Sequence, residues 1–455
     1  MLATLRLVRE NRMLRLVCSA VLLAALAPGS FAEPASPARV TIYSGDLAWV
    51  RETRTLEFAA GRDTARITGL PERIDVSSIR LAPSGKARIR RLAWMAAEPQ
   101  ADRWIERARG RRVRVSLRGD RVVEGVLTGA DAAWLMVRGD DGALETLARS
   151  AVDQIRMADP PRLTTEPVLE IVLEPGVSGR VPAELSYLTG GLSWTAEHTL
   201  VRTGEKTARW SSIVTVENAS GRSFDVPRLA LVAGQPHRVG GAPMPLMRAG
   251  LGVAMEAKAD LTEQSFSEYH LYTLDRPARL DDHETQLFTM LEPRAVEVTP
   301  RYLARPGAGV ALQLQIRNAR AAGLGVPLPA GRVRVYEADG GGEERFSGET
   351  AIAHTPEGEL VTLDVGAAFD LVAERREVAN RVISDRERES QIEVRLRNRK
   401  TVPVTIVVEE PVAGDHEIVR STHPATEKDA NTLQFSVPLA AGKETVLTYT
   451  VRQRF

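Results

Sequence analysis

Soft side chains that could bind a transition metal gather in one segment, residues 237–264, which is rich in Gly, Ala, Pro and Met. It contains His237, Met244, Met247 and Met255, and imidazole and thioether groups are ligands that copper accepts. The spacing of these residues is loose, and three Met make a poor metal motif. Loops of this length are commonly functional or disordered. The alternatives are a copper site, a flexible loop that binds a partner, and a plain mobile insertion.

Harder metal ligands are densest at Asp281, Asp282, His283 and Glu284. The other histidines are scattered, and none forms HExxH or another metal-ligand spacing. Because strand-like segments flank these four polar residues, we interpret them as a turn between two strands. The sequence therefore predicts no metal site and no cofactor.

The residues of nucleophilic catalysis do not form a motif. There is no G-x-S-x-G elbow, and the single cysteine, Cys18, lies close to the N-terminus. Gly190-Gly191 and Gly340-Gly341-Gly342 are interpreted as turns, since neither a helix nor Lys-Ser/Thr follows them as in a phosphate loop. A catalytic carboxylate pair cannot be identified here, because its separation is a three-dimensional property. No catalytic residue is predicted.

One predicted strand has a basic face. Apolar Val113, Val115 and Leu117 alternate with arginines, and the basic set comprises Arg107, Arg109, Arg111, Arg112, Arg114, Arg118 and Arg121. Such a face could bind RNA or another anion, but aromatic stacking platforms are missing from this run. Acidic residues offset it, namely Asp120, Glu124, Asp131, Asp140 and Asp141. We favour a solvated strand face and predict no nucleic-acid partner.

Two tryptophans, Trp194 and Trp210, each lie in one of two neighbouring predicted strands. They could line a sugar-binding face. A Trp near the entry of a strand more often packs in a core, and we favour that interpretation.

The elements that hold these residues are predicted to be strands almost throughout. A hydrophobic content of 43% with 26% charged residues is typical of a folded protein, and 455 residues suggest about two to four domains. Short alternating segments are separated by Gly, Asp and Pro turns, and no long helical period appears. We predict an all-β, multi-domain fold of antiparallel, immunoglobulin-like sandwiches, with a small SH3- or Sm-like barrel inserted after the N-terminal β-domain.

The predicted boundaries follow breaks in this pattern. They give a signal peptide (1–32), an N-terminal β-domain (33–100), the small barrel (104–158), a sandwich region (165–380) that contains the 237–264 insertion, and C-terminal immunoglobulin-like strands (381–455). Asp159-Pro160-Pro161 predicts a stiff junction after the barrel.

Residues 1–32 predict a cleaved signal peptide. Four arginines precede an apolar run, and Ser30 and Ala32 supply a small-x-small cleavage site. An uncleaved anchor is the alternative, but about a dozen apolar residues are short for a bilayer. Met13 is an alternative start. The mature chain is expected to begin near Glu33, to contain no cysteine or further membrane span, and to be periplasmic or otherwise exported.

Several segments follow one another in a recognisable order. They are VTIYSGDLAWVRETRTLEFAAGRDTARITGLPERIDVSSIRL, SYLTGGLSWTAEHTLVR, IVTVENASGRSFDVPRLALVAGQP and EVRLRNRKTVPVTIVVEEP, with the Gly/Met-rich insertion. In this order they resemble a family of bacterial envelope proteins, the domain of unknown function 4139 family, which includes mucoidy inhibitor A-like proteins. The chain has Ala196 and His198 where relatives tend to have Pro and Tyr, and a predicted barrel where many have a coiled coil. The resemblance implies an exported β-protein and no established activity.

These observations favour a non-enzymatic envelope protein, a scaffold or binding module whose partner is an envelope protein or a glycan. Basic and acidic residues number 60 and 59, so no global field attracts nucleic acid. The alternative is a hydrolase of envelope polysaccharide with carboxylates brought together by the fold. A cleft with two carboxylates would favour the hydrolase, whereas an exposed apolar patch or an unpaired strand edge would favour partner binding.

Overall fold

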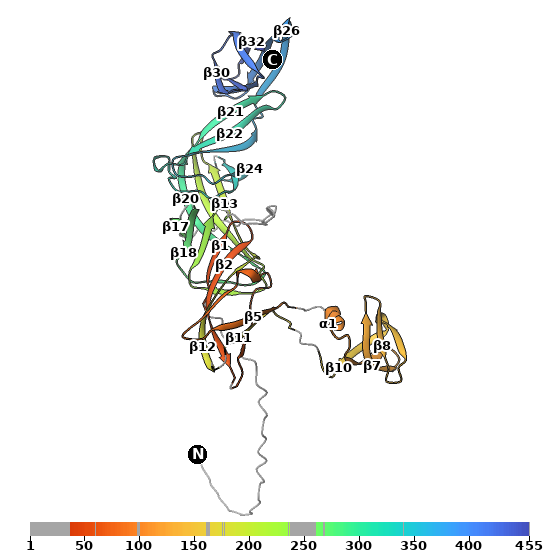
Figure 1. Ribbon diagram of the computed structural model, residues 1–455. Coiled ribbons are helices and arrows are strands. Elements are labelled where there is room, and N and C mark those ends of the chain that lie inside the picture. The colour runs from red at the N-terminus through yellow and green to blue at the C-terminus, as the bar shows by residue number, and fades with distance from the viewer. Residues whose placement is uncertain are drawn as a thin grey trace, which may run out of the picture. The chain divides into compact units, whose positions relative to one another are not determined.

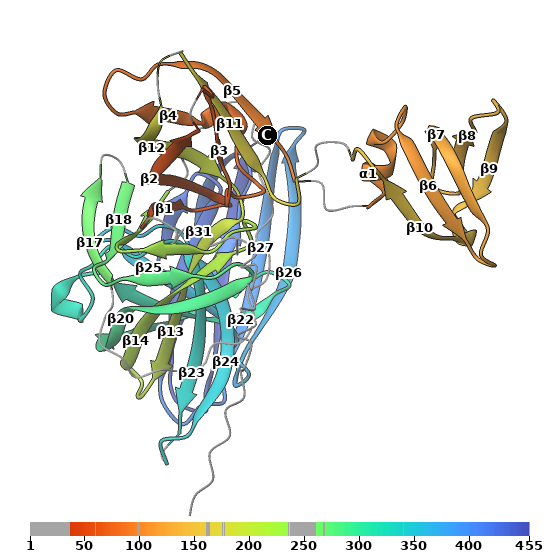
Figure 2. The same cartoon turned by 90° about the horizontal axis from the view of Figure 1, so that it is seen from below.

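The computed structural model (Figures 1 and 2) describes residues 37–454, except for residues 60, 98–100, 161–163, 175, 177, 235, 237–260, 267–268 and 340. The predicted signal peptide and the soft residues from His237 to Met255 lie outside the described residues. The described chain is almost entirely β-structure, arranged in antiparallel and mixed sheets. The predicted all-β, multi-domain, sandwich-like fold is confirmed.

A seven-stranded sheet joins strands from distant parts of the chain, in the order β17-β18-β16-β1-β2-β12-β4. Its strands are β1 (Arg39–Tyr43), β2 (Leu47–Phe58), β4 (Arg80–Pro83), β12 (Gly179–Thr189), β16 (Leu229–Ala233), β17 (Leu261–Phe266) and β18 (Tyr269–Leu274). β1 pairs in parallel with β16, and β2 pairs antiparallel with β12. Strands that sequence analysis assigns to residues 33–100 therefore share a sheet with strands assigned to 165–380, because an alternating pattern identifies a strand but not its partner. The last four residues of the predicted insertion, 261–264, belong to β17.

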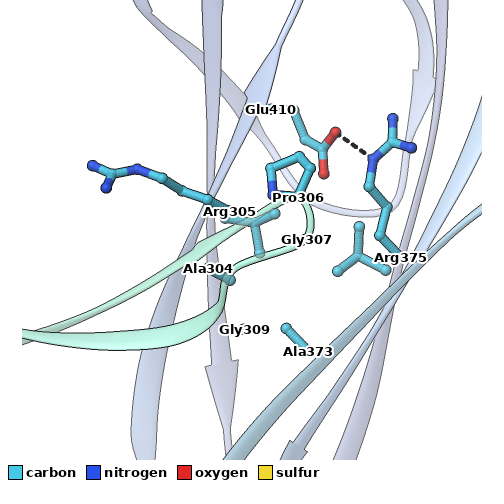
Figure 3. A pocket seen from close by; sticks show the side chains of 10 residues that line it. Ala304, Arg305, Pro306, Gly307, Gly309, Ala373, Arg375 and Glu410 are labelled. Carbon is cyan, nitrogen blue, oxygen red and sulfur yellow. Dashed lines mark hydrogen bonds and ion pairs between the residues drawn. The ribbon is translucent and has the colours of Figure 1, made fainter. Parts of the chain in front are cut away.

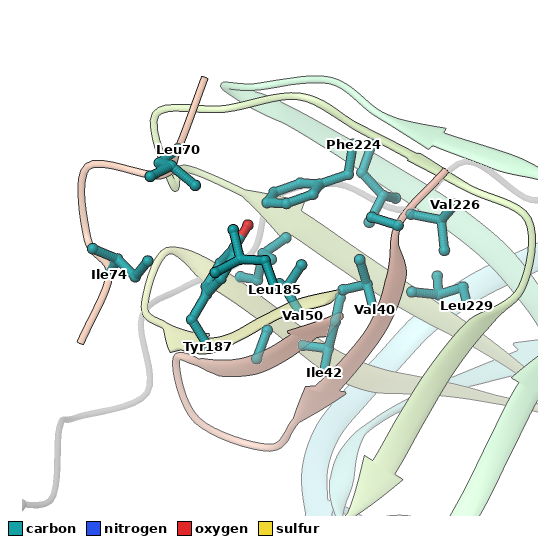
Figure 4. Close-up of a cluster of buried hydrophobic side chains, with 14 of the residues drawn as sticks. Val40, Ile42, Val50, Leu70, Ile74, Leu185, Tyr187, Phe224, Val226 and Leu229 are labelled. Carbon is teal, nitrogen blue, oxygen red and sulfur yellow. The ribbon is translucent and has the colours of Figure 1, made fainter. Parts of the chain in front are cut away.

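One core unites these strands with two smaller sheets. A three-stranded sheet, in the order β3-β11-β5, contains β3 (Thr64–Ile67), β5 (Ile89–Met95) and β11 (Val168–Leu173), and a two-stranded sheet contains β15 (Phe224–Val226) and β19 (Ala278–Leu280). Figure 4 shows Val40 and Val50 from the first part of the chain beside Tyr187, Phe224 and Leu229 from the later part. The side chains of this core are nearly all inaccessible to solvent, so the two parts fold as one hydrophobic unit.

Three further sheets hold the rest of the sandwich strands. A five-stranded sheet, in the order β20-β14-β13-β23-β24, contains β13 (Leu192–Arg202), β14 (Thr207–Asn218), β20 (Glu284–Glu297), β23 (Gly331–Ala338) and β24 (Glu344–Ile352). A six-stranded sheet, in the order β25-β22-β21-β28-β31-β30, contains β21 (Thr299–Arg305), β22 (Gly309–Arg317), β25 (Leu360–Ala367), β28 (Val404–Pro411), β30 (Ala425–Asp429) and β31 (Thr432–Leu439). A four-stranded sheet, in the order β26-β27-β32-β29, contains β26 (Leu371–Ser384), β27 (Glu387–Asn398), β29 (Asp415–Ser421) and β32 (Glu444–Arg454).

The last two of these sheets enclose the C-terminal core. Ile406 and Phe435 from the six-stranded sheet pack with Ile392 and Tyr449 from the four-stranded sheet. The predicted boundary between residues 380 and 381 falls inside β26, which pairs with β27 along its whole length. Two sheets packed face to face, here one mixed and one antiparallel, are the arrangement of a β-sandwich.

Residues 101–157 form a separate small sheet with its own core. Helix α1 (Ala101–Arg107) precedes the strands, which are β6 (Arg112–Leu117), β7 (Val122–Ala130), β8 (Trp134–Arg138), β9 (Leu144–Ala148) and β10 (Val152–Met157). Their order is β10-β6-β7-β8-β9, and among the described residues no ladder joins β9 to β10. Short 3₁₀ turns cover Val76–Ser78, Arg149–Ala151 and Arg320–Ala322. Within the described part of the chain, the one α-helix falls well short of the length and apolar character that crossing a bilayer requires.

A buried ionic cluster lies in the core of the seven-stranded sheet. Glu52 falls on the core-facing side of β2, together with Val50 and Leu56. Arg222 binds it end-on, with Nη1 2.9 Å from Oε1 and Nη2 2.7 Å from Oε2. Arg54 Nη2 lies 3.1 Å from Oε1, and the Tyr187 hydroxyl accepts a 2.8 Å hydrogen bond from Arg222. Both carboxylate oxygens thus have cationic partners.

A second buried polar group, His198, links three segments. Its Nε2 lies 3.1 Å from the carbonyl oxygen of Pro329, which can only accept, so Nε2 carries the proton. Nδ1 then accepts from the Ser212 hydroxyl at 2.8 Å, and Ser212 Oγ accepts from Trp210 Nε1 at 3.1 Å. Burial lowers the pKa of His198 to about 4. The imidazole therefore has a complete set of partners in its neutral form.

We expect Arg222→Ala to destabilise the protein strongly, because it leaves the Glu52 carboxylate buried beside Arg54 without its end-on partner. Breaking a buried ion pair by removing one member costs about 3–5 kcal/mol. The shift of the urea-unfolding midpoint measures the effect. Arg51→Ala is the matched control, since Arg51 lies one residue from Glu52 and its pair with Glu184 is exposed. Equal shifts for the two variants would show that the buried cluster contributes nothing special.

Acid should destabilise the protein through His198. Above a pH of about 6.5 the residue is neutral in both states, whereas at lower pH the unfolded chain binds a proton that the folded chain does not bind until about pH 4. Stability is therefore lost as the pH falls through this window, by about 3 kcal/mol at its end. Unfolding midpoints at pH 7.5, 5.5 and 4.5 should fall more steeply for the wild type than for His198→Gln. Parallel slopes would contradict this assignment.

Candidate functional site

A pocket opens in the C-terminal sandwich between the turn that joins β21 to β22 and the inner faces of β26, β27 and β28 (Figure 3). Its volume is about 280 Å³. It is lined by Ala304, Arg305, Pro306, Gly307, Gly309, Ala373, Arg375, Val394, Val408 and Glu410. Most of these side chains are small and apolar, so the charged groups of Arg305, Arg375 and Glu410 determine its chemistry.

The alternation of β28 brings Glu410 to this pocket. Ile406 and Val408 point into the core, and Glu410 follows on the same face of the strand with 1% of its surface exposed. An ionised carboxylate at such a position is costly unless other groups pair with it. The partners come from the opposite sheet.

Two side chains bind the same oxygen of Glu410. Arg375 Nε on β26 lies 2.9 Å from Oε2, and the Tyr449 hydroxyl on β32 lies 2.8 Å from it. Burial and the nearby Glu410 charge raise the pKa of Tyr449, so its hydroxyl stays protonated and donates. Among the described residues no hydrogen bond reaches Oε1. In Figure 3 the Glu410 carboxylate stands at the pocket, and a dashed line joins one of its oxygens to Arg375.

The neighbouring Glu409 points to the other face of β28 and is fully paired. Lys428 Nζ and Gln434 Nε2 lie 2.8 and 2.7 Å from Oε1, and Arg305 Nε lies 3.0 Å from Oε2. Burial alone would raise the pKa of Glu409, but these hydrogen bonds outweigh it and lower the pKa to about 2. A general acid needs the opposite shift. Because consecutive side chains of a strand point to opposite faces, Glu409 and Glu410 do not converge as an acid–nucleophile pair.

The acidic cluster that the sequence offers for metal binding lies elsewhere. Asp281, Asp282 and His283 form the turn between β19 and β20, as predicted. Asp282 Oδ1 accepts from the amide of Gly221 at 2.9 Å, and Asp281 pairs with Arg279 at 2.8 Å. These carboxylates are engaged in holding the turn. Across the described ranges, no three His, Cys, Asp or Glu side chains converge as metal ligands.

Both tryptophans are in the core, which confirms the structural interpretation. Trp210 is completely buried, and Trp194 is 4% exposed and makes an edge-to-face contact with Tyr272 at 6.2 Å. A sugar-binding face needs an exposed aromatic ring, so the alternative interpretation of Trp194 and Trp210 is wrong.

The arginines of the small sheet are paired with acidic neighbours, which supports a solvated face. Ion pairs join Arg112 to Asp140, Arg114 to Glu124, Arg118 to Asp153, Arg121 to Glu145 and Arg111 to Asp159. Asp140 and Glu124 had been expected to offset this charge, whereas Asp153, Glu145 and Asp159 had not been identified. Arg109 donates to the carbonyl oxygen of Ala130.

Sequence analysis missed Glu410, Arg375 and Tyr449. One signal was available in VTIVVEEP. Glu410 lies two and four positions after the apolar residues Val408 and Ile406, so strand alternation places its carboxylate on the same, core-facing side. The same alternation places Glu52 on the core-facing side of β2. The partners could not be identified, because they lie 35 and 39 residues away along the chain.

Comparison with known proteins adds a family and no activity. Residues 183–455 match the model of a domain of unknown function (DUF4139), and residues 40–124 match an N-terminal domain of unknown function (DUF4140). A search of curated proteins finds no match. The first match includes every residue that lines the pocket. Because that match covers more than half of the chain, the protein belongs to the DUF4139 family.

Proposed function

We propose that this protein is an exported, non-enzymatic envelope protein that binds a partner protein at the Glu410 pocket. The observation that carries the proposal is a buried carboxylate that presents one uncovered oxygen to a pocket. Oε1 has no hydrogen-bond partner among the described residues and is not one of their fully buried polar atoms, so a donor supplied from outside can reach it through the pocket. Membership of the envelope family suggested by the sequence supports the location.

Exposed apolar side chains on and just before β26 support a protein partner. Phe369, just before β26, is 95% exposed, and Val378 and Val382 on β26 are 56% and 64% exposed. β26 supplies Arg375 to the pocket, pairs with β27 on one side, and has no described strand on its other edge. An unpaired edge with exposed apolar residues is the feature that favours partner binding.

The hydrolase alternative has less support. Among the described residues that line the pocket, Glu410 alone carries a carboxylate, and glycoside hydrolysis ordinarily needs two. The adjacent Glu409 is held in its ionised form outside the pocket.

Two further features belong to the same proposal. Residues 1–32 are a cleaved signal peptide, and the mature protein is periplasmic. The small sheet is an SH3-like barrel, which its strand order β10-β6-β7-β8-β9 supports because the first and last strands of the unit lie side by side. Acidic neighbours pair with the arginines on its surface, so these arginines do not call for a nucleic-acid ligand.

Export is tested on the protein produced in a Gram-negative host. The proposal predicts that the periplasmic fraction contains a shortened form whose first residue, determined by mass spectrometry of the N-terminal peptide, is near Glu33. Leu22→Arg, which places a charge in the apolar run, should leave the full-length precursor in the cytoplasm. A full-length wild-type chain in the membrane fraction would instead indicate an uncleaved anchor.

Partner binding is tested by crosslinking in cells. A photoreactive amino acid at position 382, on the exposed half of β26, should give a specific crosslinked band that mass spectrometry identifies as an envelope protein. The same amino acid at position 144 is the matched control, because Leu144 is 53% exposed and lies on the small sheet.

Glu410→Gln should remove the band at position 382, whereas deletion of residues 237–260 should leave it. The reverse result would place the contact in the Gly/Met-rich segment. Recovery of glycan fragments alone would contradict a protein partner.

A further inference from the structure

We infer that the Glu410 pocket accepts the cationic end of a basic side chain, arginine or lysine, from the partner. The inference rests on the proposed function for the existence of a partner, and it adds the chemical class that the pocket recognises. It is drawn from a comparison between two clusters within this chain.

The two sandwich cores contain the same three residue types in contact. The first cluster comprises Glu52, Arg222 and Tyr187, and the second comprises Glu410, Arg375 and Tyr449. Each glutamate lies on the core-facing side of its strand with 2% or less of its surface exposed. The first cluster therefore shows how this protein stabilises a glutamate that is completely enclosed.

The clusters differ at the carboxylate Oε1. In the enclosed cluster Oε1 of Glu52 accepts from Arg222 Nη1 at 2.9 Å and from a second guanidinium, Arg54 Nη2, at 3.1 Å. In the open cluster Arg375 approaches side-on through Nε and occupies Oε2, and the Tyr449 hydroxyl binds Oε2 as well. No described residue supplies Glu410 with the donor that Arg54 supplies to Glu52.

The number of cationic partners of each glutamate also differs between the two clusters. In the enclosed cluster, two arginines bind one carboxylate in a core where the glutamate side chain has no exposed surface. At Glu410 one arginine is bound, and the charge of Arg305, which also lines the pocket, is paired with Glu409. A cation that binds Glu410 would therefore give this carboxylate two cationic partners, as Glu52 has. An ionic hydrogen bond between a guanidinium and a carboxylate is among the strongest that proteins form.

The shape of the pocket suits the stem of such a side chain. Ala304, Gly307, Gly309 and Ala373 leave space in front of Glu410, and Val394 and Val408 add apolar surface. The methylene groups of arginine and lysine pack against surfaces of this kind while the charged end reaches a polar group. The volume of about 280 Å³ lies just below the range of about 300–1,000 Å³ that is usual for small-molecule pockets, so the pocket suits a small group such as the end of one side chain.

The experiment titrates the complete mature protein with Nα-acetyl-arginine amide and follows binding by saturation-transfer NMR. Nα-acetyl-citrulline amide is the matched probe, because a neutral urea replaces the guanidinium at nearly the same size. We expect the citrulline probe to bind about tenfold more weakly or worse, since it lacks the ionic hydrogen bond. No binding of the arginine probe, or equal binding of both, would overturn the inference.

Variants assign the binding to the pocket. Glu410→Gln should weaken the arginine probe by about tenfold. Glu374→Gln, at an exposed position on β26 next to Arg375, should leave its affinity unchanged. Because Glu410→Gln can also disturb the core, Ala373→Leu provides a second test that fills the pocket and leaves the Glu410 cluster in place. Arginine binding that survives both Glu410→Gln and Ala373→Leu would place the site elsewhere. Preference for an acidic probe, Nα-acetyl-glutamate amide, would show that Arg375 is the recognition group and would overturn the inference.

These results can be separated from those of the crosslinking experiment. If Glu410→Gln removes the crosslinked partner but the arginine probe does not bind, the partner exists and the group that it inserts in the pocket is not a basic side chain. If the probe binds and no partner is crosslinked, the pocket has the inferred specificity and the proposed function fails.

Discussion

The burial of glutamate side chains inside β-sheets is the constraint on which much of this structure depends. A strand has two faces, and Glu52 and Glu410 both lie on the face that the hydrophobic core covers. A carboxylate there requires cationic and hydroxyl partners, which can come only from other strands. Arg222 and Tyr187 meet this requirement in one core, and Arg375 and Tyr449 meet part of it in the other. In the first core the partners of Glu52 are all supplied by the folded chain. In the second core the partners of Glu410 are incomplete among the described residues, which makes this carboxylate a candidate binding site.

The fold class could be predicted because alternation is a local property. The alternation of Val113, Val115 and Leu117 with arginines predicts a strand with one buried face, and those three side chains are buried in β6. Pairing is not local. Val40 lies opposite Leu229, and nothing in the residues around either position indicates the other. The extent of the shared sheet could not be predicted for this reason.

The candidate site was less accessible to prediction than the fold. Glu410 could have been recognised from its parity within β28, but an inward carboxylate shows only that partners exist. Whether those partners enclose it depends on the approach of a guanidinium from another strand, end-on for Arg222 and side-on for Arg375. This difference arises from tertiary geometry, and the two sequences around the glutamates do not contain it.

The parallel pairing of β1 with β16 has a consequence for the timing of folding. As a chain lengthens from its N-terminus, β1 and β2 appear first, but their neighbours β12 and β16 follow only after the whole of the small sheet. That sheet needs nothing outside residues 101–157, so it is the first unit able to fold. Until residue 233 has appeared, β1 has an open hydrogen-bonding edge and Val40 and Ile42 lack their core. The earliest strands of this protein therefore wait through about 190 residues of chain for their last partner, and an unpaired edge with an apolar face is open to aggregation during that time.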